Sequence, residues 1–296
     1  MIDIPEELVR TQIKYNGERG RAFVEALPEL AAHHLARWGL EVTGPSMHGM
    51  ASLVLPVAAA DGTRAALKLQ LPDEESETEG PGLRLWDGDG IVRLLDDDPD
   101  SGALLLERLD ERRHLSDLED VHEAVLVLAG LLARLVAVRA PDGMRRRLGP
   151  IAERMLADVP GALRALGDER ERRVLRDCAA AVREVVAEPG DRLLHWDLHF
   201  DNVLAADREP WLAIDPKPLA GDPGFDLMPA LDNRFDPADV RWRFDALTGE
   251  LGLDRERARA WTLGRVLQNS LWDVEDGEEG LQEEQLLIAE VLLGRG

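Results

Sequence analysis

The chain has 296 residues, which is long enough for one large domain or two lobes with a sizeable core, and its composition of 45% hydrophobic and 31% charged residues is that of a globular protein. Its 58 acidic residues against 35 basic ones give a formal net charge of −23, so the surface repels nucleic-acid backbones and anionic membranes. This charge argues against such partners. It names no substrate, because an acidic surface can serve solubility alone.

Three features bear on the cellular compartment. The single cysteine, Cys178, cannot form an intrachain disulfide, and its helical surroundings favour a packed or half-exposed structural thiol. The N-terminus shows no basic-then-apolar signal pattern. The most apolar stretch, residues 124–138, is interrupted by Arg134 and is too short to span a bilayer. We therefore expect a cytoplasmic protein.

The first part of the chain predicts a small sheet with helices. Residues 5–15 and 18–40 have helical periodicity. Two apolar runs around Asp61-Gly62 predict a β-hairpin, and residues 90–109 contain a second pair of strand-like runs around an acidic turn. Between these pairs, residues 73–86 indicate a short helix that a Gly-Pro-Gly sequence disturbs.

The remainder of the chain is mostly helical. Residues 117–140 predict a long amphipathic helix, and residues 150–187 and 226–294 are also helical in pattern. Two short strand-like segments, "RLLHW" and "WLAID", flank a polar cluster. We expect an α+β, two-lobed protein with an antiparallel-sheet N-lobe (residues 1–108) and a larger helical C-lobe (residues 109–296).

The polar cluster lies in "HWDLHFDN", where a strand runs into a tight loop. Asp197 and Asn202 can converge there, and the hairpin that follows returns the chain to deliver Asp215 beside them. Asn202 and Asp215 offer the hard oxygen ligands that suit Mg²⁺ bound to substrate phosphates, and Asp197 remains to accept a hydroxyl proton. This arrangement predicts phosphoryl transfer.

These motifs carry a family resemblance. "HWDLHFDN", "IDPK" and "GDPGFDL" resemble the signature of the aminoglycoside phosphotransferase branch of the protein-kinase-like fold. "LRLWDGDGIVRLLDDD", "LLLERL" and "WLAIDPKPLAGDPGFDL" are most similar to the streptomycin and hydroxyurea phosphotransferase family. The resemblance implies that Asp197 is the catalytic base and that His195 supports the catalytic loop. It also implies that Asn202 and Asp215 bind magnesium and that Asp226 braces the loop.

Two residues of the motif have open roles. His199 either orients the catalytic loop or contacts the acceptor. Trp196 stands where the wider family commonly has glycine, and such a side chain would narrow the acceptor side of the site.

A strand lysine that holds nucleotide phosphates and pairs with a helix glutamate is expected in this fold. Lys68, in the second strand of the predicted hairpin, matches that lysine. Glu79 matches the acid best by its spacing, with Glu75 and Glu77 as competitors. Lys217 either contacts phosphate or simply ends a strand.

Two further segments are expected to touch the nucleotide. "GPSMHGMASLVLPV" precedes the hairpin and predicts a phosphate-covering loop in which Ser46, His48 and Gly49 lie near the β- and γ-phosphates. "LLLERL" predicts a hinge, where the backbone of Glu107 and Leu109 would bind an adenine edge. The pair His33-His34 on the first helix indicates a solvated or packed face.

The acceptor is expected to lie against the C-terminal helices. Candidate acceptor residues are acids, an amide and an aromatic: Asp232, Asn269, Trp272, Asp273 and Glu275. Carboxylates there would suit the guanidinium groups of a cationic sugar such as streptomycin, although ordinary surface acids would look the same.

The predicted activity is therefore an ATP- or GTP-dependent, Mg²⁺-requiring kinase that phosphorylates a hydroxyl of a streptomycin-type aminoglycoside or hydroxyurea. Alternatives are a kinase of the same fold for choline, a methylthio sugar or a homoserine-like alcohol, and a nucleotide-binding pseudokinase scaffold. A scaffold needs no base together with metal ligands, so the intact Asp197, Asn202 and Asp215 argue against it. We expect a monomer or weak dimer.

Overall fold

The computed structural model describes residues 2–295, and the chain forms two compact units. The N-terminal unit contains the residues up to Asp110 together with Ala206–Pro210, and the C-terminal unit contains Glu111–Ala205 and the residues from Trp211 onward. Antiparallel strands dominate the first unit and helices the second, which confirms the predicted α+β class. Within residues 2–295, every helix is too short or too polar to cross a membrane.

The N-terminal unit is built on one sheet with the strand order β1-β3-β4-β6-β5, and β2 pairs with β3. All of its pairings are antiparallel. The strands are β1 (Leu40–Val42), β2 (Met47–His48), β3 (Ser52–Ala59), β4 (Arg64–Gln70), β5 (Leu94–Asp98) and β6 (Ala103–Glu107), and the helices are α1 (Glu6–Arg37) and α2 (Ser76–Trp86). The β3–β4 hairpin turns at Gly62, whose φ of 86° is a conformation that glycine adopts readily.

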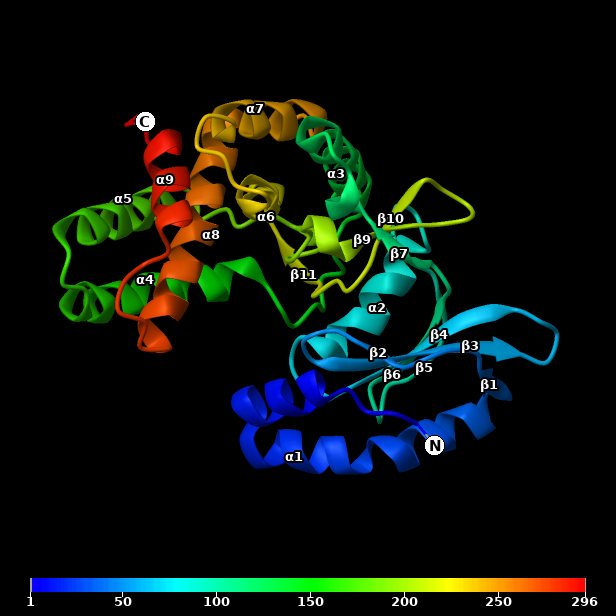
Figure 1. Ribbon diagram of the computed structural model, residues 1–296. Coiled ribbons are helices and arrows are strands. Elements are labelled where there is room, and N and C mark those ends of the chain that lie inside the picture. Colours follow the sequence, from blue (N-terminus) through cyan, green and yellow to red (C-terminus); the bar gives the residue numbers. More distant parts are fainter. Residues whose placement is uncertain (1, 296) are drawn as a thin grey trace. The chain divides into compact units, whose positions relative to one another are not determined.

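The two faces of this sheet have different roles. Figure 1 shows α1 and α2 on opposite faces of the sheet. Leu67 and Leu69 of β4 are fully buried and belong to the hydrophobic core that includes Leu27 of α1. Lys68 lies between them in sequence, so strand alternation directs its side chain to the opposite face, where Glu79 of α2 lies.

The first helix is bent sharply at Gly17, which has φ 53° and ψ −128°. The helical segments before and after the bend pack so closely that a Cβ atom on Gly20 would overlap the backbone oxygen of Gln12. The two helical patterns predicted on either side of residues 16–17 are therefore two arms of one bent helix.

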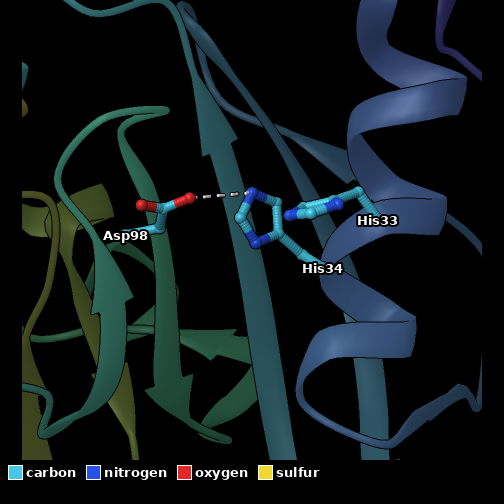
Figure 2. Close-up of side chains that lie close together, drawn as sticks. All are labelled: His33, His34 and Asp98. Carbon is cyan, nitrogen blue, oxygen red and sulfur yellow. Dashed lines mark ion pairs between the residues drawn. The ribbon is translucent and has the colours of Figure 1, made fainter.

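His34 of α1 is packed against β5, whereas its neighbour His33 is exposed (Figure 2). The His34 Nε2 atom lies 3.0 Å from Ser101 Oγ and 3.7 Å from Asp98 Oδ2, and burial lowers the pKa of His34. Asp98 also pairs with Arg37 at 3.3 Å and accepts the Ser101 hydroxyl. These side chains are arranged like metal ligands, but their contacts already hold α1 to the sheet edge.

The C-terminal unit is a helical body. Its helices are α3 (Val121–Leu135), α4 (Leu148–Ala165), α5 (Glu169–Val185), α6 (Met228–Asp232), α7 (Val240–Glu250), α8 (Arg255–Glu275) and α9 (Glu283–Leu292). The long helix α8 packs along α5 and also contacts α4 and α9. Cys178 of α5 is buried in this core, and burial raises its pKa to about 12, so the thiol is unreactive at neutral pH.

Two small sheets carry the loops of the predicted site, and the β10–β9 and β11–β8 pairings in them are antiparallel. One has the order β10-β9-β7 and the other pairs β11 with β8. The strands are β7 (Asp110–His114), β8 (Arg192–Leu194), β9 (Val203–Ala205), β10 (Trp211–Ala213) and β11 (Leu219–Gly221). The β8 and β10 strands lie in the segments that the sequence predicts. The β7 strand lacks any apolar alternation, and β11 lies between Pro218 and Pro223 with no longer apolar run around it, so neither shows a strand pattern.

Gly190 precedes β8 with φ 81°, and a Cβ atom there would lie 2.6 Å from the backbone oxygen of Gly221. Gly252 also has a positive φ, 62°, but a Cβ atom there would have nothing within 4 Å. We predict that Gly252→Ala lowers the free energy of unfolding by about 1 kcal/mol, because only backbone strain is added. Gly190→Ala adds a clash with backbone and should lower it by at least about 3 kcal/mol. Urea denaturation measures both, and equal losses would contradict the packing described here.

Candidate active site

The catalytic loop follows β8 and begins with an unusual backbone conformation. Trp196 has φ 75°, which is rare for a bulky residue. The carboxylate of Asp226 holds this turn: one oxygen accepts the backbone N–H of His195 at 2.8 Å and the other accepts that of Trp196 at 2.9 Å. Asp226 is fully buried in the 3₁₀ turn Pro223–Leu227. The acid that the resemblance implied as a brace thus contacts the loop through both of its oxygens.

The electrostatics of Asp226 combine two opposing influences. Burial raises the pKa of Asp226 to about 7, while the two N–H donors and the positive charge of Arg265 lower it. Because both carboxylate oxygens accept N–H groups, the ionised form is the one that the surrounding backbone stabilises.

His195 links the catalytic loop to the chain that leaves β10. Its Nε2 lies 3.0 Å from the carbonyl oxygen of Ile214, and its own carbonyl accepts the backbone N–H of Lys217 at 3.0 Å. Burial lowers the pKa of His195 to about 4, so the ring is neutral at pH 7 and donates its Nε2 proton to Ile214. The side chain is completely buried, which suits loop support and leaves no surface for a substrate.

Asp197 comes next in the loop and is partly exposed, with 26% of its side-chain surface accessible. Its Oδ2 accepts a hydrogen bond from Lys217 Nζ at 2.9 Å. Burial alone would raise the pKa of Asp197, but the Lys217 ammonium overcomes this and holds it below its usual value. Asp197 is therefore an ionised carboxylate at neutral pH.

Asn202 and Asp215 are brought together by one backbone hydrogen bond. The carbonyl of Asn202 accepts the N–H of Ile214 at 2.9 Å, which places Asp215 beside it. The Asn202 amide nitrogen donates to the Asp197 carbonyl at 2.9 Å, and no hydrogen bond within residues 2–295 reaches the amide oxygen. A carbonyl-type oxygen and a carboxylate fit the ligand chemistry of Mg²⁺.

His199 lies on the more open side of the loop. Its side chain is 31% exposed, and its Nδ1 is 3.9 Å from Asp201 Oδ2, which is a weak contact. Asp201 is itself anchored, because its side chain accepts the Ser116 hydroxyl at 2.6 Å and its carbonyl lies 3.2 Å from a ring nitrogen of His114. The contacts of His199 agree with either loop orientation or acceptor binding.

The Trp196 ring stacks with arginine side chains that sequence reasoning missed. The guanidinium of Arg265 lies 4.4 Å from the ring centroid and that of Arg146 lies 5.1 Å from it. The Trp272 ring centroid is 6.4 Å away. The sequence does carry a signal for Arg265, because this charged residue interrupts the apolar face of α8. In the structure it is only 5% exposed. These contacts hold the ring that precedes Asp197.

In the N-terminal unit, Lys68 and Glu79 form a buried ion pair. Lys68 Nζ lies 2.7 Å from both carboxylate oxygens of Glu79, and Gln70 donates to the same carboxylate at 2.8 Å. Helix α2 continues through Gly80-Pro81-Gly82, which keeps Glu79 on a helix facing β4. Of the three acids considered for this contact, Glu79 makes it. The side chains of the pair are only 6% and 3% exposed.

The predicted phosphate-covering loop lies at β2 and the turn that follows it. His48 is exposed, and one of its ring nitrogens lies 3.2 Å from the carbonyl of Gly49. The Gly49 N–H donates to the Ser52 carbonyl at 3.0 Å and is therefore already used within the hairpin. Ser46 is half-buried just before β2. A phosphate would meet the side chains and the remaining N–H groups of this turn.

The predicted hinge begins at the end of β6. The Glu107 N–H donates to the carbonyl of Arg93, so only its carbonyl can take part in binding an adenine edge. The Glu107 carboxylate accepts Arg208 Nε at 3.0 Å and Nη2 at 2.7 Å. Sequence reasoning missed Arg208, which lies about 100 residues away in an exposed-looking turn and gives no local signal. Leu109 is buried.

The comparisons with known proteins now decide the family. The family model for the aminoglycoside/hydroxyurea antibiotic resistance kinase matches residues 37–277. The chain belongs to this kinase family. It is 65% identical to a hydroxyurea phosphotransferase from Kitasatospora aureofaciens, over 100% of this chain and 87% of the relative. It is 57% identical to a streptomycin 6-kinase from Streptomyces glaucescens, over 99% and 98% of the two chains.

A solved structure supports the fold. A thermostable mutant of an aminoglycoside phosphotransferase, in a ternary complex with AMP-PNP and hygromycin B, matches with a TM-score of 0.63 over 90% of this chain and 98% of its own. At 13% identity this likeness speaks for the fold alone. The predicted recognition, the two-lobed kinase-like fold and the assignment as a phosphotransferase are confirmed.

The five candidate acceptor residues of the kinase all lie in its C-terminal unit: Asp232 at the end of α6, and Asn269, Trp272, Asp273 and Glu275 on α8. Trp272 is 39% exposed near Trp196, and Glu275 is exposed. Asp273 is buried and accepts the side-chain amide of Gln282 at 2.9 Å, which ties α8 to the start of α9. Burial raises the pKa of Asp232.

The Lys68–Glu79 pair leads to a stability prediction. Glu79→Gln leaves the buried ammonium of Lys68 without this carboxylate charge, so the free energy of unfolding should fall by roughly 3 kcal/mol. Glu77→Gln makes the same chemical change on the exposed side of α2 and should shift it by no more than about 0.5 kcal/mol. Urea denaturation followed by circular dichroism compares the variants. A Glu79→Gln protein as stable as Glu77→Gln would contradict the buried pair.

The Asp226 contacts lead to a second prediction. In Asp226→Asn the amide has a single acceptor oxygen, so one of the two backbone N–H groups of the catalytic loop faces an NH₂ group. We expect the free energy of unfolding to fall by about 2 kcal/mol. The displaced loop should lower kcat on the order of 100-fold. The control is Asp207→Asn at an exposed turn, and wild-type kcat in the Asp226→Asn enzyme would refute the bracing role.

Proposed function

We propose that this kinase transfers the γ-phosphoryl group of ATP or GTP to a hydroxyl group of a streptomycin-type aminoglycoside or of hydroxyurea. The main support for this proposal is the Asp197 carboxylate, which is ionised and partly exposed. The same loop contributes Asn202, and Asp215 lies beside Asn202. The relatives at 65% and 57% identity, named hydroxyurea phosphotransferase and streptomycin 6-kinase, supply the two acceptor candidates.

Each unit supplies a part of the proposed machinery. Residues 1–108 would bind the nucleotide, with Lys68 on its phosphates. Residues 109–296 would hold the catalytic loop and the acceptor. Asn202 and Asp215 would hold Mg²⁺, which neutralises charge on the β- and γ-phosphates when bound. Dependence on ATP would favour a cytoplasmic enzyme, and we expect it to be a monomer or weak dimer.

The proposed step is a single in-line displacement. The acceptor hydroxyl oxygen forms a bond to the γ-phosphorus, and the bond from that phosphorus to the bridging oxygen breaks, leaving its electron pair on the diphosphate. The acceptor proton passes to the carboxylate of Asp197. Because the pKa of Asp197 lies below its usual value, this carboxylate mainly orients the hydroxyl and receives the proton as the new bond forms.

The exposed side chains near the end of α8 suit an acceptor with polar groups. Trp272 offers an exposed aromatic edge, and Glu275 an exposed carboxylate one turn further along α8. Such groups would pack against a sugar ring and bind a guanidinium through a charge-assisted hydrogen bond.

The test replaces Asp197. In Asp197→Ala, phosphate transfer from labelled ATP should fall by about 10³-fold or more, because no other carboxylate of the loop holds the hydroxyl. The ATP–Mg²⁺-induced rise in melting temperature should persist. Asp207→Ala, at an exposed turn, is the control. Streptomycin, hydroxyurea, choline and homoserine are compared as acceptors. Retained turnover in Asp197→Ala, or transfer to choline or homoserine alone, would reject the proposal.

A further inference from the structure

The two oxygens of the Asp197 carboxylate have different surroundings. Oδ2 accepts the hydrogen bond from Lys217 Nζ at 2.9 Å. Within residues 2–295, no donor bonds Oδ1. Asp197 and Lys217 are 20 residues apart in sequence and come from the loop after β8 and from the chain after β10. The ion pair thus fixes one oxygen of the carboxylate and leaves the other to a ligand.

The backbone of Lys217 is fixed on two sides. Its N–H donates to the carbonyl of His195 at 3.0 Å, and its carbonyl accepts Arg146 Nη1 at 2.7 Å. The Arg146 guanidinium also lies over the ring of Trp196, the residue that precedes Asp197. Lys217 is therefore attached, directly and through Arg146, to the two residues that precede Asp197. These contacts fix the backbone from which its ammonium reaches the carboxylate.

A role in stability alone does not account for this arrangement. The side chains of Lys217 and Asp197 are 34% and 26% exposed, and ion pairs in such contact with water contribute little to folding. Lys68, by contrast, has a 6% exposed side chain in its pair with Glu79. Lys68 thus belongs to a buried structural pair. Lys217 belongs to a solvent-accessible pair with Asp197, the carboxylate at which transfer is proposed.

We propose that Lys217 is a positioning residue for phosphoryl transfer: its ammonium holds Oδ2 of Asp197 so that Oδ1 faces the acceptor hydroxyl. This inference rests on the proposed function. It resolves the alternatives left by the sequence, in which Lys217 either contacts phosphate or merely ends a strand. Without Lys217 the carboxylate can rotate about its Cβ–Cγ bond, and the hydroxyl loses its fixed orientation toward the γ-phosphorus.

The experiment compares Lys217→Met, which keeps the chain length and removes the charge, with Lys217→Arg, which keeps the charge. We expect Lys217→Met to lower kcat on the order of 100-fold while the KM values for ATP and for the acceptor change less than about threefold. Lys217→Arg should recover at least about a tenth of wild-type kcat. Lys14→Met, the same change at an exposed lysine of α1, is the matched control and should keep wild-type kinetics.

A second measurement separates positioning from a merely structural role. In Lys217→Ala, added ethylamine should restore part of kcat, because a free ammonium can occupy the space beside Oδ2, whereas it should have no effect on Lys14→Ala. Wild-type kcat in Lys217→Met would overturn the proposal. Two other results would also overturn it. One is a loss of kcat in Lys217→Arg as large as that in Lys217→Met, and the other is a loss of kcat in Lys217→Ala that added amine does not reverse.

The same assays distinguish this inference from the proposed function. If the wild-type enzyme phosphorylates neither streptomycin nor hydroxyurea, the proposed acceptors are wrong, and the Lys217 variants are then compared by the slow transfer of phosphate from ATP to water. That reaction uses the same base, so a Lys217→Met rate equal to that of the wild type would refute the positioning role alone. Absence of any ATP turnover by the wild type would reject both.

Discussion

The catalytic loop depends on one carboxylate that accepts two adjacent backbone N–H groups. Asp226 is fully buried and bonds the N–H groups of His195 and Trp196, and this contact holds Trp196 in a left-handed conformation that a bulky residue otherwise avoids. The turn at Trp196 directs Asp197 away from the strand direction of β8. The position of Asp197 in the site therefore depends on Asp226, an acid that is itself fully buried.

Cations and carboxylates are gathered around this loop in an otherwise acidic molecule. The chain has a net charge of −23, yet Lys217, Arg265 and Arg146 all lie near Trp196 and Asp197. Lys217 and Arg265 both lower the pKa of Asp197. Within an acidic protein, these cations thus offset the carboxylates of the loop and favour the ionised form of Asp197.

The two units use burial differently. In the N-terminal unit, the Lys68–Glu79 pair is almost fully removed from water and joins β4 to α2, so it contributes to the structure of this unit. In the C-terminal unit, the buried groups Asp226 and His195 are bonded to backbone, whereas Asp197 in the same loop stays partly accessible. The buried polar groups thus support the loop, and the carboxylate of Asp197 stays in contact with solvent.

The sequence by itself determined the strand–loop–hairpin order that carries Asp197, Asn202 and Asp215, because these residues are close along the chain and their spacing is set by local turns. It also determined the α+β class and the family. The tertiary structure alone decided that Lys217 pairs with Asp197, that Arg265 and Arg146 stack on Trp196, and that Arg208 holds Glu107. Those contacts join residues up to 101 positions apart, and which side chains meet across such separations depends on packing rather than on sequence spacing.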